Sequence, residues 1–420
     1  MNVASDFMLN DKCIRNGVRG GDAAATTSLS KFHFSAGTEA LNMSLVFTLA
    51  LRNLFQDRLR FIASLMGIVF SVVLVLVQMG LYFGFSGMIT TMIDHTSTDL
   101  WIVSTGAKYF EDLSLLNTRM RDRLLAIEGV SEVVPGVVGF SAWSLPDGAM
   151  TSVVVVGSDV ADHGVSPWNV VEGSAQSLAT PGTVVIDRTY FDRLGVSGGV
   201  GATAQIRALP VTVGAVTDGI RSFTTTPYVF TDLRGAHAYI GLPGGFTSHF
   251  LVRLKPGADI ERTRQNILSN ISGIQALTPD QFREQSRSFW LFSTGAGAAL
   301  VAGALLGVIV GTVIVAQTLY SSTKDHLYEF ATLRAMGASN SYIYQVIICQ
   351  ALVNAIIGFV IAALIGAAIV HFTAKSALQV VITPNLIIEL FFVTIFMCIV
   401  SAITAIFRVV RVDPAIVLTR

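Results

Sequence analysis

The polar residues that could perform chemistry are spread through the middle of the chain, residues 88–288. Aspartates stand near expected turns and strand ends, where such residues usually cap, at Asp187, Asp192, Asp218 and Asp232. Histidines occur without a common spacing at His163, His237 and His249. No His-Glu-x-x-His motif and no Cys/His pair at metal-ligand spacing is present. We therefore expect no enzyme active site, no metal and no cofactor.

A nucleotide-binding P-loop is also missing from the sequence. That loop needs a Gly-Lys pair, because glycine amides and a lysine side chain surround the phosphates. None of the lysines follows a glycine; they are Lys12, Lys31, Lys108, Lys255, Lys324 and Lys375. If ATP drives this protein, the hydrolysis is expected in a separate chain.

Residues 322–347 offer a different kind of site, a docking surface. The sequence STKDHLYEFATLRAMGASNSYIYQVI has apolar residues at Leu327, Phe330 and Leu333, then Arg334 and Gly337. This pattern is typical of a short helix that ends at a glycine. An amphipathic helix of this kind could press into a groove on a partner protein.

The composition places this docking surface in a membrane protein. Apolar residues make up 52% of the chain, charged residues make up 13%, and the mean hydropathy is +0.62. A soluble domain carries about 25% charged residues. Basic and acidic residues each number 28, and this balance argues against a nucleic-acid partner, which would need a basic surface.

Four segments reach the roughly 20 apolar residues that a helix needs to cross a bilayer. The expected fold is an α-helical membrane protein with four transmembrane helices and an α+β periplasmic domain inserted between helices 1 and 2. The expected boundaries are a disordered tail 1–42, an interfacial helix 43–60, a first span 61–87, the α+β domain 88–288, a second span 289–318, a loop 319–341, a third span 342–372, a short loop 373–385, a fourth span 386–407 and a tail 408–420.

Basic residues near the ends of the spans predict the orientation. Eight lie on one side, at Arg52, Arg58, Arg60, Lys324, Arg334, Arg408, Arg411 and Arg420. Three lie on the other side, at Arg283, Arg287 and Lys375. We therefore expect both termini and the loop 319–341 in the cytoplasm, and residues 88–288 outside the inner membrane.

Small residues recur every four positions in two spans. They form one ridge with Gly303, Gly307 and Gly311, and another with Gly358 and Gly366. Such ridges let helices approach closely in lipid. Two interpretations remain open, a seam between two copies of the chain and ordinary packing within one copy. Glu389 is the single charged residue in a span, which argues against a transporter powered by protons.

The loop and the C-terminus together resemble the permeases of MacB/FtsX-type ABC transporters. The loop sequence EFATLRAMGAS and the ending RVVRVDPAIVLTR carry the resemblance, the ending through Arg408, Arg411, Asp413 and Pro414. The segment LALRNLFQDRLRFIASLMGIVF resembles the DevC-like subgroup in particular. The resemblance covers about residues 44–420, and the order of one span, a large outer domain and three spans is that of the family.

The resemblance implies a permease that binds no ATP itself and pairs with a separate ABC ATPase, usually as a homodimer. The ATPase-coupling region would include Glu329, Phe330, Leu333, Arg334, Gly337 and Ala338. Export by mechanotransmission would further involve a periplasmic membrane-fusion adaptor and an outer-membrane channel. Two alternatives stay open, an FtsX-like regulator of a periplasmic hydrolase and a lipoprotein-release permease.

Overall fold

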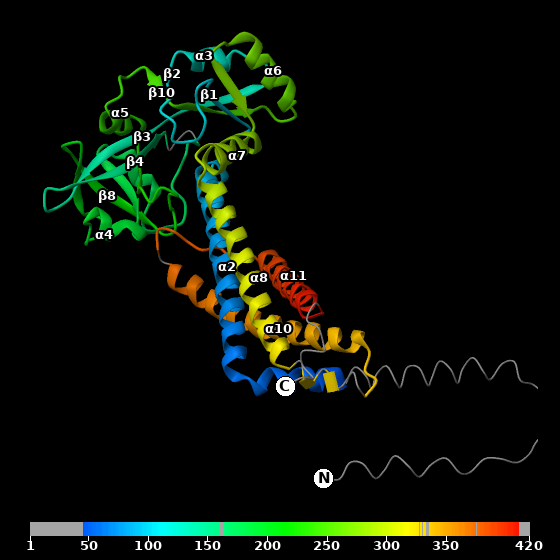
Figure 1. Cartoon of the computed structure of the whole chain (residues 1–420). Helices are drawn as coiled ribbons and strands as arrows, with labels where there is room; N and C mark the ends of the chain where they lie inside the picture. The colour runs from blue at the N-terminus through cyan, green and yellow to red at the C-terminus, as the bar shows by residue number, and fades with distance from the viewer. Residues whose placement is uncertain are drawn as a thin grey trace, which may run out of the picture.

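The computed structural model describes residues 45–159, 163–326, 328–329, 331–332, 336–374 and 376–410 (Figure 1). Among these residues, the helices long and apolar enough to cross a membrane are α2 (Arg58–Asp94), α8 (Ala296–Asp325), α10 (Asn340–Thr373) and α11 (Pro384–Val410). A shorter apolar helix, Leu45–Gln56, precedes α2. The predicted tail 1–42 and residues 411–420 lie outside the described residues.

Helix α2 runs from the membrane bundle into the α+β domain. It contains 37 residues, which at 1.5 Å per residue span about 55 Å. A bilayer core measures roughly 30 Å, so the helix extends well beyond it. Near its far end Met92 and Ile93 are each 1% exposed, which places them in the core of the α+β domain.

The other three long helices pack around α2. Helix α2 contacts α8, α10 and α11, and α11 also contacts α8 and α10. The buried core of this bundle includes Ile68, Val72 and Leu76 from α2, Val315 from α8 and Ala355 from α10. Figure 1 shows α2 and α8 side by side, with the α+β domain at their far end.

The second span differs in its bounds from the sequence prediction, which began at residue 289. Helix α7 (Pro279–Ser288) ends at Ser288, Phe289–Ser293 form a π-helical turn, and α8 begins at Ala296. Gly295 between them has φ +79°, a left-handed conformation that glycine adopts without steric cost. This residue separates α7, which belongs to the α+β domain, from the apolar helix.

The α+β domain contains the twelve described strands β1 (Leu100–Ser104), β2 (Leu116–Asn117), β3 (Val130–Ser144), β4 (Met150–Ser158), β5 (Val170–Gly173), β6 (Thr183–Asp187), β7 (Thr203–Ile206), β8 (Leu209–Thr217), β9 (Tyr228–Thr231), β10 (Phe246–Thr247), β11 (His249–Leu254) and β12 (Ile274–Leu277). Its helices besides α7 are α3 (Met120–Leu125), α4 (Phe191–Leu194), α5 (Leu233–Ile240) and α6 (Ile260–Asn270), with 3-10 turns at Ala175–Ala179 and Arg188–Tyr190.

The main sheet has the order β12-β1-β11-β3-β4-β9-β6-β8-β5, and β7 pairs with β3 and β8. Strand β3 joins two lobes, because its first half pairs with β11 and its second half pairs with β4. The first lobe holds β1, β11 and β12 with α3 and α6, and the second holds β4 to β9 with α4 and α5 (Figure 1). Strands β2 and β10 form a separate pair.

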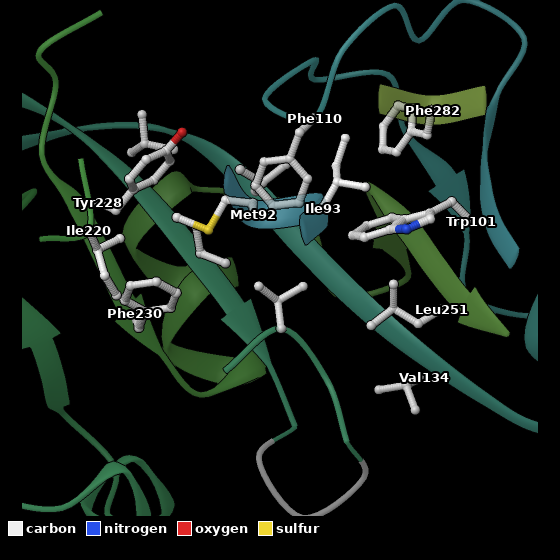
Figure 2. Packing of buried hydrophobic residues seen from close by; sticks show 14 of the residues in the cluster. Met92, Ile93, Trp101, Phe110, Val134, Ile220, Tyr228, Phe230, Leu251 and Phe282 are labelled. Carbon is white, nitrogen blue, oxygen red and sulfur yellow. The ribbon is translucent and has the colours of Figure 1, made fainter. Parts of the chain in front are cut away.

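The end of α2 lies between the two lobes. Figure 2 shows Met92 and Ile93 among large apolar side chains that come from both of them. Trp101, Phe110 and Phe282 surround them from the first lobe, and Ile220, Tyr228 and Phe230 from the second. The end of α2 is therefore part of the apolar core that the two lobes share.

Candidate functional site

The segment between α8 and α10, residues 326–339, carries the predicted docking surface and is called here the α8–α10 loop. Of its predicted residues, Phe330, Leu333 and Arg334 lie outside the described residues. The Glu329 side chain is 50% exposed, and its carboxylate lies 3.1 Å from Nδ1 of His326. Gly337 has φ +99°, and a Cβ placed there would meet no atom within 4 Å. Ala338 is half-buried.

Two exposed apolar side chains accompany Glu329 in this loop. Tyr328 is 68% exposed and Met336 is 72% exposed. Exposed aromatic and methionine side chains are enriched at protein interfaces. The sequence prediction missed both, although their place beside the expected helix was a usable signal.

The loop is anchored to the beginning of α2. Asp325 is the last residue of α8, and its carboxylate forms an ion pair with Arg60. Arg60 also bonds Asp57 through Nε at 3.0 Å and donates to the carbonyl oxygen of Ser321 at 3.3 Å. The same side chain thus ties the end of α8 to the start of α2, directly before the exposed loop.

The predicted glycine ridges both pack against α2 within one chain. A Cβ at Gly307 would lie 3.2 Å from Val75, and one at Gly311 would lie 2.3 Å from Oγ of Ser71. The Ser71 hydroxyl donates to the carbonyl oxygen of Gly307 at 2.6 Å.

The remaining ridge glycines have α2 neighbours too. A Cβ at Gly303 would lie 2.9 Å from the Gln78 side chain, one at Gly358 would lie 2.5 Å from Ile68, and one at Gly366 would lie 2.6 Å from Leu76. Helix α2 therefore packs closely against both α8 and α10, and at Gly311, Gly358 and Gly366 a Cβ would force the neighbouring residue of α2 to move.

A second contact holds α2 at the end of the bundle next to the α+β domain. The segment between α10 and α11, residues 374–383, is called here the α10–α11 loop. The backbone N–H of Val381 donates to the carbonyl oxygen of Gly80 at 3.0 Å. A Cβ at Gly84 would lie 2.2 Å from the carbonyl oxygen of Gln379. The loop also accepts a hydrogen bond at Ala374 from Nη2 of Arg221 at 2.9 Å, so it joins α2 to the α+β domain.

The acidic and histidine side chains of the α+β domain do not converge on one site. Asp187 accepts hydrogen bonds from Thr217 Oγ1 and from the N–H of Ile220, and Asp232 caps α5. Asp192, Asp218 and His163 are exposed, and His237 bonds the carbonyl oxygens of Leu233 and Phe246. Among the described residues no group of these side chains could hold a metal ion.

One short pattern in the domain has the spacing of a nucleophile elbow. Residues 195–199 read Gly-Val-Ser-Gly-Gly, which matches Gly-x-Ser-x-Gly. An elbow places its serine between a strand and the helix that follows it. Here Ser197 is exposed and follows the short helix α4, with β7 next in the chain. The residues do not form an elbow.

Among the titratable groups buried in the domain core, Glu111 and His249 have pKa values far from their ordinary ones. Burial raises the pKa of the Glu111 carboxyl to about 7, although a hydrogen bond from the Tyr228 hydroxyl opposes the shift. Burial lowers the pKa of His249 to about 3. His249 is 2% exposed and packs beside Trp101, with ring centroids 5.1 Å apart.

Two family models match the chain. The MacB-like periplasmic core domain matches residues 61–269, and the FtsX-like permease C-terminal matches residues 296–414. An uncharacterised ABC transporter permease protein of Mycobacterium tuberculosis is 24% identical over 194 residues, which cover 45% of this chain and 22% of that protein. The chain thus spans less than a quarter of that relative's length.

Two solved structures are similar at low identity. The extracellular domain of the noncanonic ABC-type transporter YknZ from Gram-positive bacteria is 13% identical with a TM-score of 0.33, over 43% of this chain and 99% of that chain. The periplasmic region of MacB from Actinobacillus actinomycetemcomitans is 11% identical with a TM-score of 0.35, over 45% of this chain and 92% of that chain. On the two family models, which together match residues 61–269 and 296–414, the chain belongs to the MacB/FtsX-type family of ABC transporter permeases.

Proposed function

We propose that this permease is the membrane subunit of a DevC-like ATP-driven exporter. A separate cytoplasmic ATPase would bind the α8–α10 loop, and a periplasmic adaptor with an outer-membrane channel would receive the motion at the α+β domain. Two copies of the permease would form the working unit. The observation that carries the proposal is the path of α2, whose first turns contact the end of α8 through Arg60 and whose end lies in the domain core.

The proposed motion follows from the contacts of α2. Closure of the ATPase would move the α8–α10 loop, and Asp325 would pass the displacement to Arg60. Helix α2 would carry it along its length, because α8 and α10 pack against it through glycines. The lobes of the α+β domain would then shift around Met92 and Ile93. Such a device can act on a substrate that is already outside the membrane.

Co-purification would identify the partners of the permease. The permease, tagged after its last residue and extracted in mild detergent, should retain an ABC ATPase and an adaptor protein. Recovery of the ATPase with a cell-wall hydrolase and no adaptor would favour the regulator over the exporter. Recovery of neither partner from cells that express the neighbouring genes would contradict the proposal.

We expect the α+β domain outside the cell membrane and the α8–α10 loop in the cytoplasm, because basic residues favour the cytoplasmic side. In a background that lacks Cys13, Cys349 and Cys398, a cysteine at the exposed position Ser197 should react with an impermeant maleimide in cells with a permeabilised outer membrane. A cysteine at the exposed position Ser341 should react only after lysis. The opposite labelling pattern would reverse the topology.

The purified permease should show no ATPase activity above a detergent blank, because no Gly-Lys pair is available to hold phosphates. Addition of the ATPase subunit should produce turnover, and addition of the ATPase with a mutated P-loop lysine should not. Phosphate release is the measurement. Turnover by the permease alone, after removal of contaminating ATPases, would contradict the assignment of roles.

Glu329→Lys should weaken binding of the ATPase. The carboxylate is half exposed and lies in the same loop as the exposed side chains of Tyr328 and Met336. Loss of one partner of a buried interfacial charge pair costs about 2–5 kcal/mol, which lowers affinity about 30-fold or more. Glu284→Lys on α7 makes the same charge change at an exposed position of the α+β domain and is the matched control. Equal affinities of both variants and the wild type would remove Glu329 from the interface.

A further inference from the structure

A polar cavity lies where the helix Leu45–Gln56 meets the bundle, at the end of the spans that carries the α8–α10 loop. Asn53 from this helix, Ser64 from α2, Ser322 from α8, and Gln350 and Asn354 from α10 contribute to its lining. The cavity has a volume of about 20 Å³ and opens in part to solvent. A cavity needs about 10–15 Å³ to hold one water.

Two polar atoms in this lining have no hydrogen-bond partner among the described residues. They are Nδ2 of Asn53 and Oδ1 of Asn354. The two residues are 3% and 1% exposed. The other end of the Asn354 amide is engaged, because its Nδ2 donates to Ser64 Oγ at 3.4 Å. Buried polar atoms are nearly always paired with protein or with ordered water, so these two point to an occupant.

The two unpaired atoms have complementary needs. Nδ2 of Asn53 is a donor and Oδ1 of Asn354 is an acceptor. A water molecule can accept from the first and donate to the second at the same time. A cation does not fit the donor, and the one carboxylate in the lining, that of Asp57, is already bonded to Arg60 through both oxygens. An empty cavity does not fit either, because cavities that stay dry are lined by apolar groups.

We propose that this cavity binds one ordered water that bridges Asn53 and Asn354 and joins the helix Leu45–Gln56 to α10. That helix contact also contains an apolar cluster, in which Val46 and Ala50 pack against Val346. Apolar packing is non-directional, whereas a bridged pair of amides is satisfied in one register. The water therefore fixes how the first helix packs on α10, seven residues before Arg60 links α2 to α8.

The role in coupling rests on the proposed function, but the water site does not. Its test therefore uses the permease alone, purified in detergent, and leaves the ATPase out. Asn53→Leu and Asn354→Leu each break the bridge and leave the other amide unpaired. Each should lower the midpoint of thermal unfolding by roughly 2–5 °C. The double variant, which leaves neither amide unpaired, should be no less stable than the worse single variant. Asn340→Leu, at the exposed start of the same helix α10, is the control and should change nothing.

Independent detection of the water comes from hydroxyl radicals that X-ray radiolysis generates inside the protein. Leu54 and Leu319 line the cavity and are 8% and 3% exposed. Both should be oxidised in the wild type, and Leu291, which is 3% exposed and does not line this cavity, should not. The double variant should lose this oxidation. Additive destabilisation in the double variant, or oxidation of Leu54 and Leu319 no greater than that of Leu291, would overturn the proposal.

Discussion

Replacement of Gly84 by alanine should destabilise the permease, whereas the same replacement at Gly87 should stabilise it. Both glycines lie in α2, three residues apart. Alanine in place of glycine within a helix gains about 1 kcal/mol. At Gly87 nothing opposes this gain, because a Cβ there would meet no atom within 4 Å. The two variants therefore differ only in what the new methyl group touches.

At Gly84 the methyl group would lie 2.2 Å from the carbonyl oxygen of Gln379. This oxygen belongs to the backbone, so no side-chain rotation can relieve the contact and the α10–α11 loop must move. Overpacking of this kind costs about 1–3 kcal/mol, which exceeds the gain in helix propensity over most of that range. Gly84→Leu should cost more, because the longer side chain also meets Val381.

The change should also be visible at one hydrogen bond. Movement of the loop would break the bond from the Val381 N–H to the carbonyl oxygen of Gly80. Hydrogen exchange at Val381 should therefore be at least about tenfold faster in Gly84→Ala than in Gly87→Ala, as expected for a bond worth roughly 1.4 kcal/mol. Unfolding midpoints of the two variants in detergent give the second readout. Equal midpoints and equal exchange would mean that the loop does not rest on α2.

The sequence predicted the long apolar helices because their signal is local. A run of about 20 apolar residues is sufficient to identify a candidate span, and all four predicted segments overlap with long helices in the structure. The spacing of Gly303, Gly307 and Gly311 likewise predicted a ridge, but spacing does not reveal the partner of a ridge. The structure provides it, since the three glycines face Gln78, Val75 and Ser71 of α2.

Strand β3 shows where local signals mislead. Proline and glycine usually weaken or end a strand, yet β3 runs through Pro135 and Gly136 and continues to Ser144. Gly136 is required inside the strand because a Cβ there would lie 2.2 Å from Nε2 of His249. The glycine thus makes room for a side chain that is more than a hundred positions away in the sequence. No periodicity within the strand carries that information.

The sequence could not predict the polar cavity for the same reason. Asn53 and Asn354 are separated by about three hundred residues, and each alone is an ordinary polar residue within an apolar helix. Only the packing of the helix Leu45–Gln56 on α10 brings them to one site. Glu329, in contrast, could be selected from the sequence because the whole loop is contiguous.

The stability of the permease should depend on pH through His249 and Glu111, with opposite signs. His249 has a pKa of about 3 in the folded chain, against an ordinary histidine pKa of 6.5. Between these values the unfolded chain binds a proton that the folded chain excludes, so the free energy of unfolding falls as the pH is lowered from 6.5 to 3. At pH 4.5 the loss from this residue is roughly 2–3 kcal/mol, at about 1.4 kcal/mol per pH unit.

Glu111 acts the other way. Its pKa is about 7 in the folded chain, against an ordinary glutamate pKa of 4.5, so between these values the folded chain holds a proton that the unfolded chain has released. The free energy of unfolding therefore falls as the pH is raised from 4.5 to 7, by roughly 3 kcal/mol in total. Between pH 4.5 and 6.5 the two slopes nearly cancel. The joint contribution of Glu111 and His249 to the free energy of unfolding should decline below pH 4.5 because of His249 and above pH 6.5 because of Glu111.

Two variants separate these contributions. His249→Phe keeps a planar ring beside Trp101 and removes the group that binds the proton. When the pH is lowered from 7 to 4.5, the free energy of unfolding of this variant should rise by roughly 2–3 kcal/mol relative to that of the wild type. Glu111→Gln keeps an oxygen that can accept a hydrogen bond from the Tyr228 hydroxyl. When the pH is raised from 4.5 to 7.5, the free energy of unfolding of this variant should rise by roughly 3 kcal/mol relative to that of the wild type. Denaturant unfolding of the purified permease, repeated across this range, measures both differences. Because each prediction concerns a change in slope, a constant packing defect in either variant does not affect it. If either variant runs parallel to the wild type from pH 3.5 to 7.5, that residue is not held in the protonation state that its burial requires.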